Sequence, residues 1–315
     1  MRNFRYIIFV LILVAIVAQI LFMKEDASKN SEAPINTKLM ISLSTFSLYD
    51  IAKHIGGDTV ELVMIMPFGV DAHSFEPTPK LMTKIHDSSL VIYSGAGLEP
   101  WIKGFDFKNL TVDMSQHVKL RKLGIGEHHE HGDEEPSHNN GTDPHYWLDI
   151  DNMISAANVI TGELIKILPS NEELYVKSRD SYIEMLKKLD SDYKNEFLTC
   201  KSDTIIVNHN AFSYLADRYG FHIESLSGLS PEAEPSAKSM ANLIEHIKEH
   251  NVSTIFFESF ASDRAIKSIA EEANASVDVL QPIGNITADE AKQNLSFEDI
   301  MRLNLTKISK ALDCK

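Results

Sequence analysis

Residues 171–197 read NEELYVKSRDSYIEMLKKLDSDYKNEF, the longest stretch with helical periodicity in this chain of 315 residues. No glycine or proline interrupts it, and its apolar side chains recur on or near one face: Leu174, Tyr182, Met185, Leu189 and Phe197. At ~1.5 Å per residue such a helix is roughly 40 Å long, about the length of a domain. We therefore predict that residues 171–198 form a rigid helix that connects two lobes.

Strands alternate with helices on both sides of this segment. Before it, the apolar runs predict strands at residues 38–44, 60–66 and 90–93. After it, they predict strands at residues 204–208, 254–257 and 277–280. Such alternation indicates right-handed crossovers and mainly parallel sheets. The expected fold is thus two similar α/β lobes, residues 38–170 and 199–315, joined by the long helix.

The first 25 residues are interpreted as a targeting segment. Arg2 and Arg5 precede an apolar run at residues 6–23. Their positive charge orients the N-terminus toward the cytoplasm. A membrane anchor and a cleaved signal peptide both fit this run, and the lack of a clear Ala-x-Ala site favours the anchor slightly. A polar linker at residues 26–37 follows. We therefore expect the lobes to function outside the cytoplasm, at the cell surface or in the periplasm, tethered to the membrane by the N-terminus.

Charge and cysteine content limit the possible partners and the compartment. The formal net charge is −15, which argues against nucleic acid as a partner because that would require a basic surface. The chain has 2 cysteines, Cys200 and Cys314. An even pair in an oxidising compartment is compatible with a disulfide. Two unrelated thiols are the alternative.

Three of the 13 histidines lie in short contexts of rigid and aromatic residues. His73 and His209 each follow a predicted strand, and His145 precedes a helix in the first lobe. Ligands collect at the carboxyl ends of strands in such lobes, so the three side chains are expected to meet in the cleft between the lobes. Three imidazoles with an open fourth position are a known zinc arrangement, whereas manganese and magnesium sites use mainly carboxylate oxygens.

Residues 127–140 form a loop rich in histidine and acidic residues. Residues 127–138 contain His128, His129, His131 and His138 but no lysine or arginine. This stretch is too polar to order itself by burying apolar surface. Its functional interpretation is a weak collector of metal ions beside the cleft, and the alternative is a solvated acidic insert with no role in transport.

Several motifs together resemble the metal-specific solute-binding proteins of ABC importers, in the zinc-uptake (ZnuA-like) branch of the TroA-like family. They are residues 73–79 (HSFEPTP), 143–149 (DPHYWLD), 209–220 (HNAFSYLADRYG) and 230–236 (SPEAEPS), with further similarity at 257–258 and 280–284. The resemblance implies a metal held between the lobes by His73, His145 and His209. Manganese-type relatives usually have a carboxylate at the position of His209. The family's fourth contact aligns with Gln281, a poor zinc ligand, so water or another residue is expected there.

The resemblance implies a binding protein and no enzyme. It would capture Zn²⁺, with Mn²⁺ the less favoured ion, and deliver it to an ABC transporter permease with a cytosolic ATPase. The alternatives are a manganese-type binding protein, a metal-dependent adhesin and, less favoured, a zinc hydrolase, for which no general-base motif is evident. Because capture requires neutral imidazoles, we expect binding to fail as the pH falls toward ~6.

Overall fold

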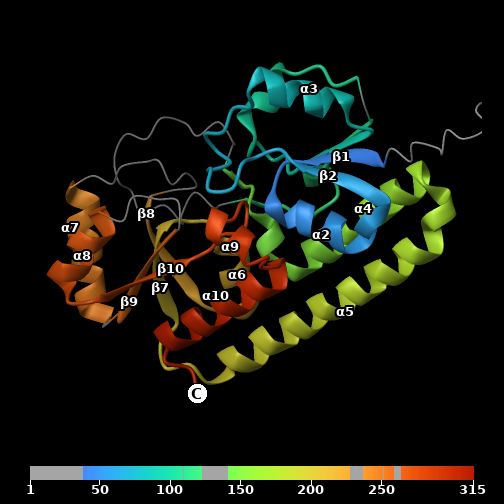
Figure 1. Ribbon diagram of the computed structural model, residues 1–315. Coiled ribbons are helices and arrows are strands. Elements are labelled where there is room, and N and C mark those ends of the chain that lie inside the picture. The colour runs from blue at the N-terminus through green and yellow to red at the C-terminus, as the bar shows by residue number, and fades with distance from the viewer. Residues whose placement is uncertain (1–37, 109, 123–140, 228–236, 251, 259–263) are drawn as a thin grey trace, which may run out of the picture. The chain divides into compact units, whose positions relative to one another are not determined.

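The computed structural model describes residues 38–108, 110–122, 141–227, 237–250, 252–258 and 264–315 (Figure 1). The chain divides into two units, Met1–Lys38 and Leu39–Lys315, and everything described below lies in the second unit. Within the described residues, no helix is both long enough and sufficiently apolar to cross a membrane. The apolar run at residues 6–23 and the acidic loop at 127–140 lie outside the described residues.

The first lobe is a parallel four-stranded sheet with helices. Its strands are β1 (Leu39–Leu43), β2 (Val60–Met64), β3 (Leu90–Tyr93) and β4 (Leu110–Asp113), in the spatial order β2-β1-β3-β4. Helix α2 (Phe46–Gly56) connects β1 to β2, and α3 (Pro79–Asp87) precedes β3. The start of α3 follows from its sequence, because the Thr78 hydroxyl accepts the Leu81 N–H and Pro79 occupies the first turn. A short antiparallel ribbon, β5 (Arg121–Lys122) with β6 (Thr142–Asp143), completes this lobe.

The second lobe repeats this topology. Its strands are β7 (Thr204–His209), β8 (His222–Ser227), β9 (Thr254–Glu258) and β10 (Ser276–Leu280), in the order β10-β9-β7-β8, and all pairs are parallel. In both sheets, therefore, the lobe's first strand lies between its second and third strands, and its fourth strand lies beside the third. The helices of this lobe are α6 (Ser213–Tyr219), α7 (Ala237–His250), α8 (Arg264–Ala273), α9 (Ala288–Lys292) and α10 (Phe297–Ala311).

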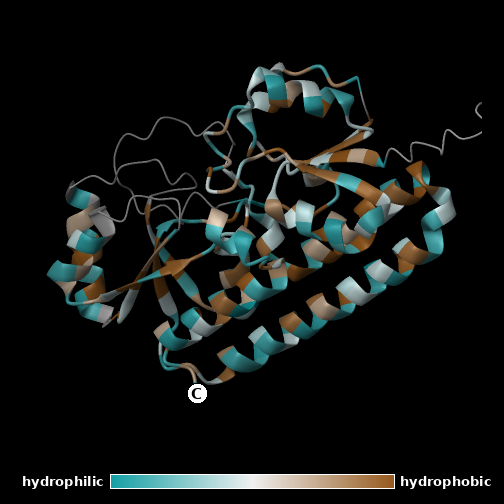
Figure 2. Cartoon of the chain, in the orientation of Figure 1, coloured by the Kyte–Doolittle hydropathy of each residue, from teal (hydrophilic) through white to brown (hydrophobic). Residues whose placement is uncertain are grey.

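Helix α5 (Glu172–Glu196) runs along both lobes, after α4 (Ile150–Ile167) of the first (Figure 1). It packs on α2 and α4 of the first lobe and on α10 of the second. Figure 2 shows the alternation of hydrophobic and hydrophilic residues along it. Two buried tyrosines fix it to the two lobes: the Tyr182 hydroxyl, near the middle of the helix, donates to Asp50 Oδ2 of α2 at 2.9 Å, and the Tyr193 hydroxyl, in its last turn, donates to the Met301 carbonyl of α10 at 2.6 Å. The α/β class, the parallel sheets and the long connecting helix predicted from the sequence are thus confirmed.

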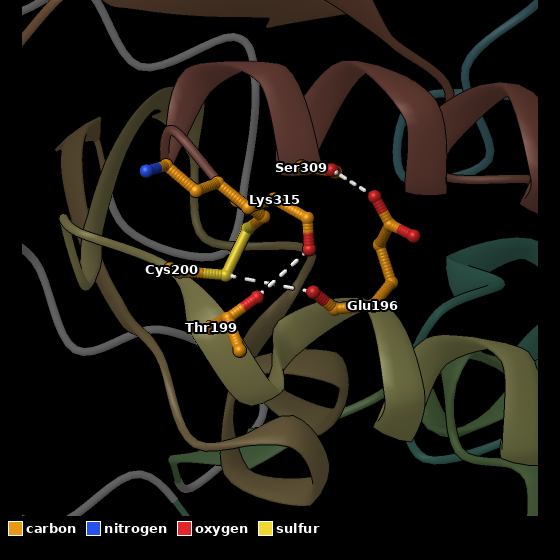
Figure 3. The surroundings of a disulfide bond; sticks show 6 residues. Glu196, Thr199, Cys200, Ser309 and Lys315 are labelled. Atoms are coloured by element: carbon orange, nitrogen blue, oxygen red, sulfur yellow. Dashed lines mark hydrogen bonds between the residues drawn. A yellow bond between two sulfur atoms is a disulfide. The ribbon is translucent and has the colours of Figure 1, made fainter.

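The two cysteines form a disulfide, Cys200–Cys314, across a sequence separation of 114 residues. Figure 3 shows how it fastens the C-terminus to the chain just beyond α5. Backbone hydrogen bonds support the same junction, because the Lys201 and Ser202 N–H groups both donate to the Leu312 carbonyl. The Thr199 hydroxyl also donates to the Lys315 carbonyl at 2.8 Å. Of the two possibilities left open by the sequence, the structure has the disulfide.

Candidate metal site

The three histidines come from three different loops or strand ends. His73 lies in the loop after β2, and His145 follows β6 at the start of a 3₁₀ turn, Tyr146–Leu148. Both belong to Asp-x-His turns: the Asp71 carboxylate accepts the His73 N–H at 2.8 Å, and the Asp143 carboxylate accepts the His145 N–H at 2.9 Å. His209 is the last residue of β7 in the second lobe. The two lobes therefore both contribute to one site.

The imidazoles converge as the sequence predicted. One ligand atom of each lies within 4.8 Å of the others, and His73 Nε2 is 3.4 Å from His145 Nε2. Ring centroids are 5.4 Å apart for His73–His145 and His145–His209, and 6.2 Å apart for His73–His209. A tetrahedral zinc ion with Zn–N bonds of ~2.0–2.1 Å places its nitrogens roughly 3.4 Å apart. The observed spacing therefore fits one ion with only small side-chain adjustments.

A cavity of about 20 Å³ opens between the histidines. It is lined by all three imidazoles together with Trp147, Glu258 and Gly284. A water molecule needs roughly 10–15 Å³ when volume is measured in this way. The cavity therefore has room for a single ion or a water-sized ligand and excludes an organic substrate.

Burial favours the neutral form of His73 and His209. His145 and His209 are 2% and 1% exposed, and His73 is somewhat more accessible. Burial lowers the pKa of His209 to about 3, and the nearby His145 acts in the same direction. Burial also lowers the pKa of His73 well below its ordinary value, with His145 and His209 contributing. A neutral imidazole has the free lone pair that a metal ion requires.

Two buried carboxylates lie against the site histidines. Asp143 Oδ1 is 2.8 Å from His145 Nδ1, and the hydroxyl of Ser213 donates to the other oxygen of Asp143. Glu258, at the end of β9, contacts Nδ1 of His209 through Oε1. Burial raises the pKa of Glu258 to about 8. Both acids lie in motifs from which the sequence predicted no role for them, although the Asp-x-His spacing at 143–145 is a visible signal.

Gln281 is not among the residues that line the cavity. Its Nε2 donates to Glu290 Oε2 at 2.9 Å, and its backbone pairs with the side chain of Asn304 on α10. Among the described residues, the group able to hold a metal contains only the three histidines.

The inter-lobe loop, residues 281–287, belongs to the second lobe but is hydrogen-bonded to the first. The Trp147 indole N–H donates to the Pro282 carbonyl at 2.6 Å. The Asn285 amide donates to the Pro67 and Val70 carbonyls at 2.7 and 2.8 Å. A Cβ at position 284 would lie 3.0 Å from Trp147 Cζ2, so glycine permits the loop to pack against the indole. This loop closes one side of the cavity.

Comparison with known proteins agrees with this fold. The family described as "Zinc-uptake complex component A periplasmic" matches residues 41–311. The chain is 30% identical to the high-affinity zinc uptake system protein ZnuA of Bacillus subtilis, over 91% of this chain and 92% of the relative. It is 32% identical to the zinc-binding protein AdcA of Streptococcus pyogenes, where the match covers 88% of this chain but only 56% of the relative.

Solved structures give the same result. The Zn(II)-bound ZnuA-like domain of Streptococcus pneumoniae AdcA superposes with a TM-score of 0.73 at 30% identity, covering 88% of this chain and 99% of that one. The metal-dependent lipoprotein YcdH of Bacillus subtilis superposes with a TM-score of 0.74 at 31% identity, covering 87% of this chain and all of that one. The chain therefore belongs to the ZnuA family of zinc-uptake components.

Proposed function

We propose that this protein is an extracytoplasmic solute-binding protein that captures Zn²⁺ and delivers it to an ABC transporter permease with a cytosolic ATPase. His73, His145 and His209 are the proposed ligands. The observation that carries the proposal is the convergence of three imidazoles from both lobes on a cavity of about 20 Å³. The zinc-binding and zinc-uptake names of the relatives support it. The protein binds and releases its ion without catalysing a reaction.

Zinc is favoured over manganese by the atoms that face the cavity. Three nitrogen ligands suit zinc, whereas manganese sites are richer in carboxylate and water oxygens. The lipoprotein name of the relative in Streptococcus pneumoniae supports a location on the outer side of a membrane. In this proposal the N-terminal segment tethers the lobes there, and the acidic histidine-rich loop at 127–140 collects ions near the cleft.

The architecture also suggests how the ion is released. The lobes are tied to each other by α5 and by the hydrogen bonds of the inter-lobe loop, so a wide hinge motion would break many contacts. Release then requires a small displacement, such as separation of the loop from Trp147 when the permease docks. The strained left-handed backbone of Ile283, with φ of 62°, marks one place where this loop stores free energy of the order of 1–3 kcal/mol.

Zinc titration of the lobes tests the proposal. Protein purified without added metal is analysed for metal content and then titrated in competition with a chromophoric chelator. We expect one tightly bound Zn²⁺ per chain, much weaker Mn²⁺ binding, and loss of tight zinc binding when all three histidines are replaced by alanine. Tight binding retained by the triple variant would refute the assignment of the ligands. A loss-of-function strain tests delivery: growth should fail in chelated medium and recover when zinc is added.

A further inference from the structure

The two lobes each place one buried carboxylate behind one buried imidazole. In the first lobe Asp143 is 0% exposed and lies 2.8 Å from Nδ1 of His145. In the second lobe Glu258 is 3% exposed and contacts Nδ1 of His209. Buried carboxylates are costly to desolvate, so a residue of this kind needs a compensating partner.

Strand pairing fixes the position of Glu258. Strands β7 and β9 are parallel neighbours with Ile206 opposite Ile255 and Val207 opposite Phe256. Continuing this register by two residues brings the last residue of β7, His209, to the last residue of β9, Glu258. The backbone N–H of Glu258 donates to Asn208 Oδ1 at 3.1 Å and holds this strand end in place. The contact between imidazole and carboxylate is therefore built into the sheet.

Glu258 contacts one nitrogen of the His209 imidazole and leaves the other for an ion. Among the described residues the metal-binding group comprises the three histidines and does not include this carboxylate. Its Oε1 contacts Nδ1 of His209, so Nε2 is the imidazole nitrogen that remains available for an ion. An imidazole that ligates a metal through one nitrogen commonly donates its other N–H to a carboxylate, which fixes the tautomer and the ring orientation.

We propose that Glu258 is a positioning residue for zinc: it accepts the Nδ1–H of His209 and holds the lone pair of Nε2 toward the ion, as Asp143 does for His145. This inference rests on the proposed function, because it concerns the same site. It assigns Glu258 a role beyond the three ligands, and it predicts that Glu258 and Asp143 have equivalent effects although they belong to different lobes.

The test compares three variants of the whole protein. Glu258→Gln and Asp143→Asn keep the shape of each side chain and replace one acceptor oxygen by an amide NH₂ group. Glu99→Gln is the matched control, because Glu99 is also a buried carboxylate but is bound to Ser44, Ser94 and Gly95 and does not line the cavity. Zinc affinity is measured by chelator competition, ligand geometry by the visible absorption of the Co²⁺-loaded protein, and folding by thermal unfolding without metal.

We expect Glu258→Gln and Asp143→Asn each to weaken zinc binding about 10- to 100-fold and to change the Co²⁺ spectrum. The control should bind zinc within about 3-fold of the original protein and keep its spectrum. If Glu258→Gln binds zinc like the control, with an unchanged spectrum, the positioning role is refuted. Failure of the original protein to bind zinc at all would instead refute the proposed function, so the two failures are distinguishable.

A second measurement needs no variant and covers the case in which Glu258→Gln does not fold. In the zinc-loaded original protein, ¹⁵N NMR of the imidazoles identifies which nitrogen carries the proton and which binds the ion. The expected result is a protonated Nδ1 and a zinc-bound Nε2 for His209. Zinc coordination through Nδ1 of His209 would overturn the proposal, because Glu258 would then have no N–H to accept.

Discussion

Removing the disulfide should destabilise the protein by an amount that its loop length determines. Replacing Cys200 and Cys314 by serine opens a closed loop with a sequence separation of 114 residues. In the chain-entropy model, a loop of this length restricts the unfolded chain by about 5 kcal/mol at 25 °C. The surrounding hydrogen bonds from Lys201, Ser202 and Thr199 remain in the variant and keep the folded junction close to its present geometry.

This free energy translates into a shift of the melting temperature. A unit that extends from Leu39 to Lys315 has an unfolding entropy of roughly 0.6 kcal/mol/K at about 2.1 cal/mol/K per residue. A loss of about 5 kcal/mol then lowers the melting temperature by roughly 8 °C. Differential scanning calorimetry of the metal-free protein measures this directly. The single variants Cys200→Ser and Cys314→Ser serve as controls, since each opens the same loop and should give the same shift.

Zinc affinity provides an internal check on this prediction. Neither cysteine lines the cavity between the histidines, so the double variant should bind zinc as tightly as the original protein. A melting temperature lowered by less than about 2 °C would refute the reasoning from loop closure. It would mean that the hydrogen bonds at the junction, or residual structure in the unfolded chain, already restrict the ends.

Three further predictions concern pH and release. Burial lowers the pKa of His73 and lowers that of His209 to about 3, so zinc affinity measured by chelator competition should fall only slightly between pH 7 and 5.5. Two ordinary imidazoles would give a fall of roughly 70-fold over that interval, and a fall of that size would contradict the structure. A small fall would correct the sequence-based expectation that binding fails near pH 6. Burial raises the pKa of Glu99 from 4.5 to about 7, so the folded state binds the proton more tightly than the unfolded chain, and this group's contribution to stability is present below pH 4.5 and declines as the pH rises through 7. Urea unfolding at pH 4.5 and 8 measures this: the free energy of unfolding of Glu99→Gln, relative to that of the original protein, should rise by about 3 kcal/mol over that interval. Parallel pH profiles of the two unfolding free energies would exclude this. Asn285→Ala removes two hydrogen bonds of the inter-lobe loop and should speed zinc dissociation on the order of 10-fold in stopped-flow chelator capture, whereas an unchanged rate would show that the loop does not limit release.

The interior of each lobe could be predicted from the sequence, and two edge strands could not. Strands with continuous apolar runs, such as β3 and β7, were predicted within one residue of their observed ends. The missed strands β4 and β8 each lie at one edge of a four-stranded sheet, and the two-residue strands β5 and β6 were missed as well. The first two residues of β4 are exposed, and β8 has only two apolar residues among its six. An edge strand has one neighbour and less buried surface, so its sequence gives a weaker signal.

The site residues, too, include some that the sequence could identify and others that it could not. The three histidines could be identified because each lies in a distinctive local context at a strand end or turn. Glu258 could not be paired with His209, because their contact depends on the pairing of β7 with β9, which are far apart in the sequence. The orientation of Gln281 was equally hidden, since it depends on a hydrogen bond to Glu290 of α9. Tertiary contacts of this kind have no counterpart in local sequence patterns.

The attachment of α5 to both lobes has a consequence for how loading is signalled. Because Tyr182 and Tyr193 of one continuous helix are bound to different lobes, the separation of the lobes is set by a spacer of fixed length and hardly depends on occupancy. A membrane partner then has little change in global shape by which to distinguish cargo-bearing molecules from empty ones. It must sense the surface immediately around the ion, where residues 281–287 meet the first lobe. Because the lobe separation is fixed, small-angle scattering with and without zinc should give indistinguishable radii of gyration.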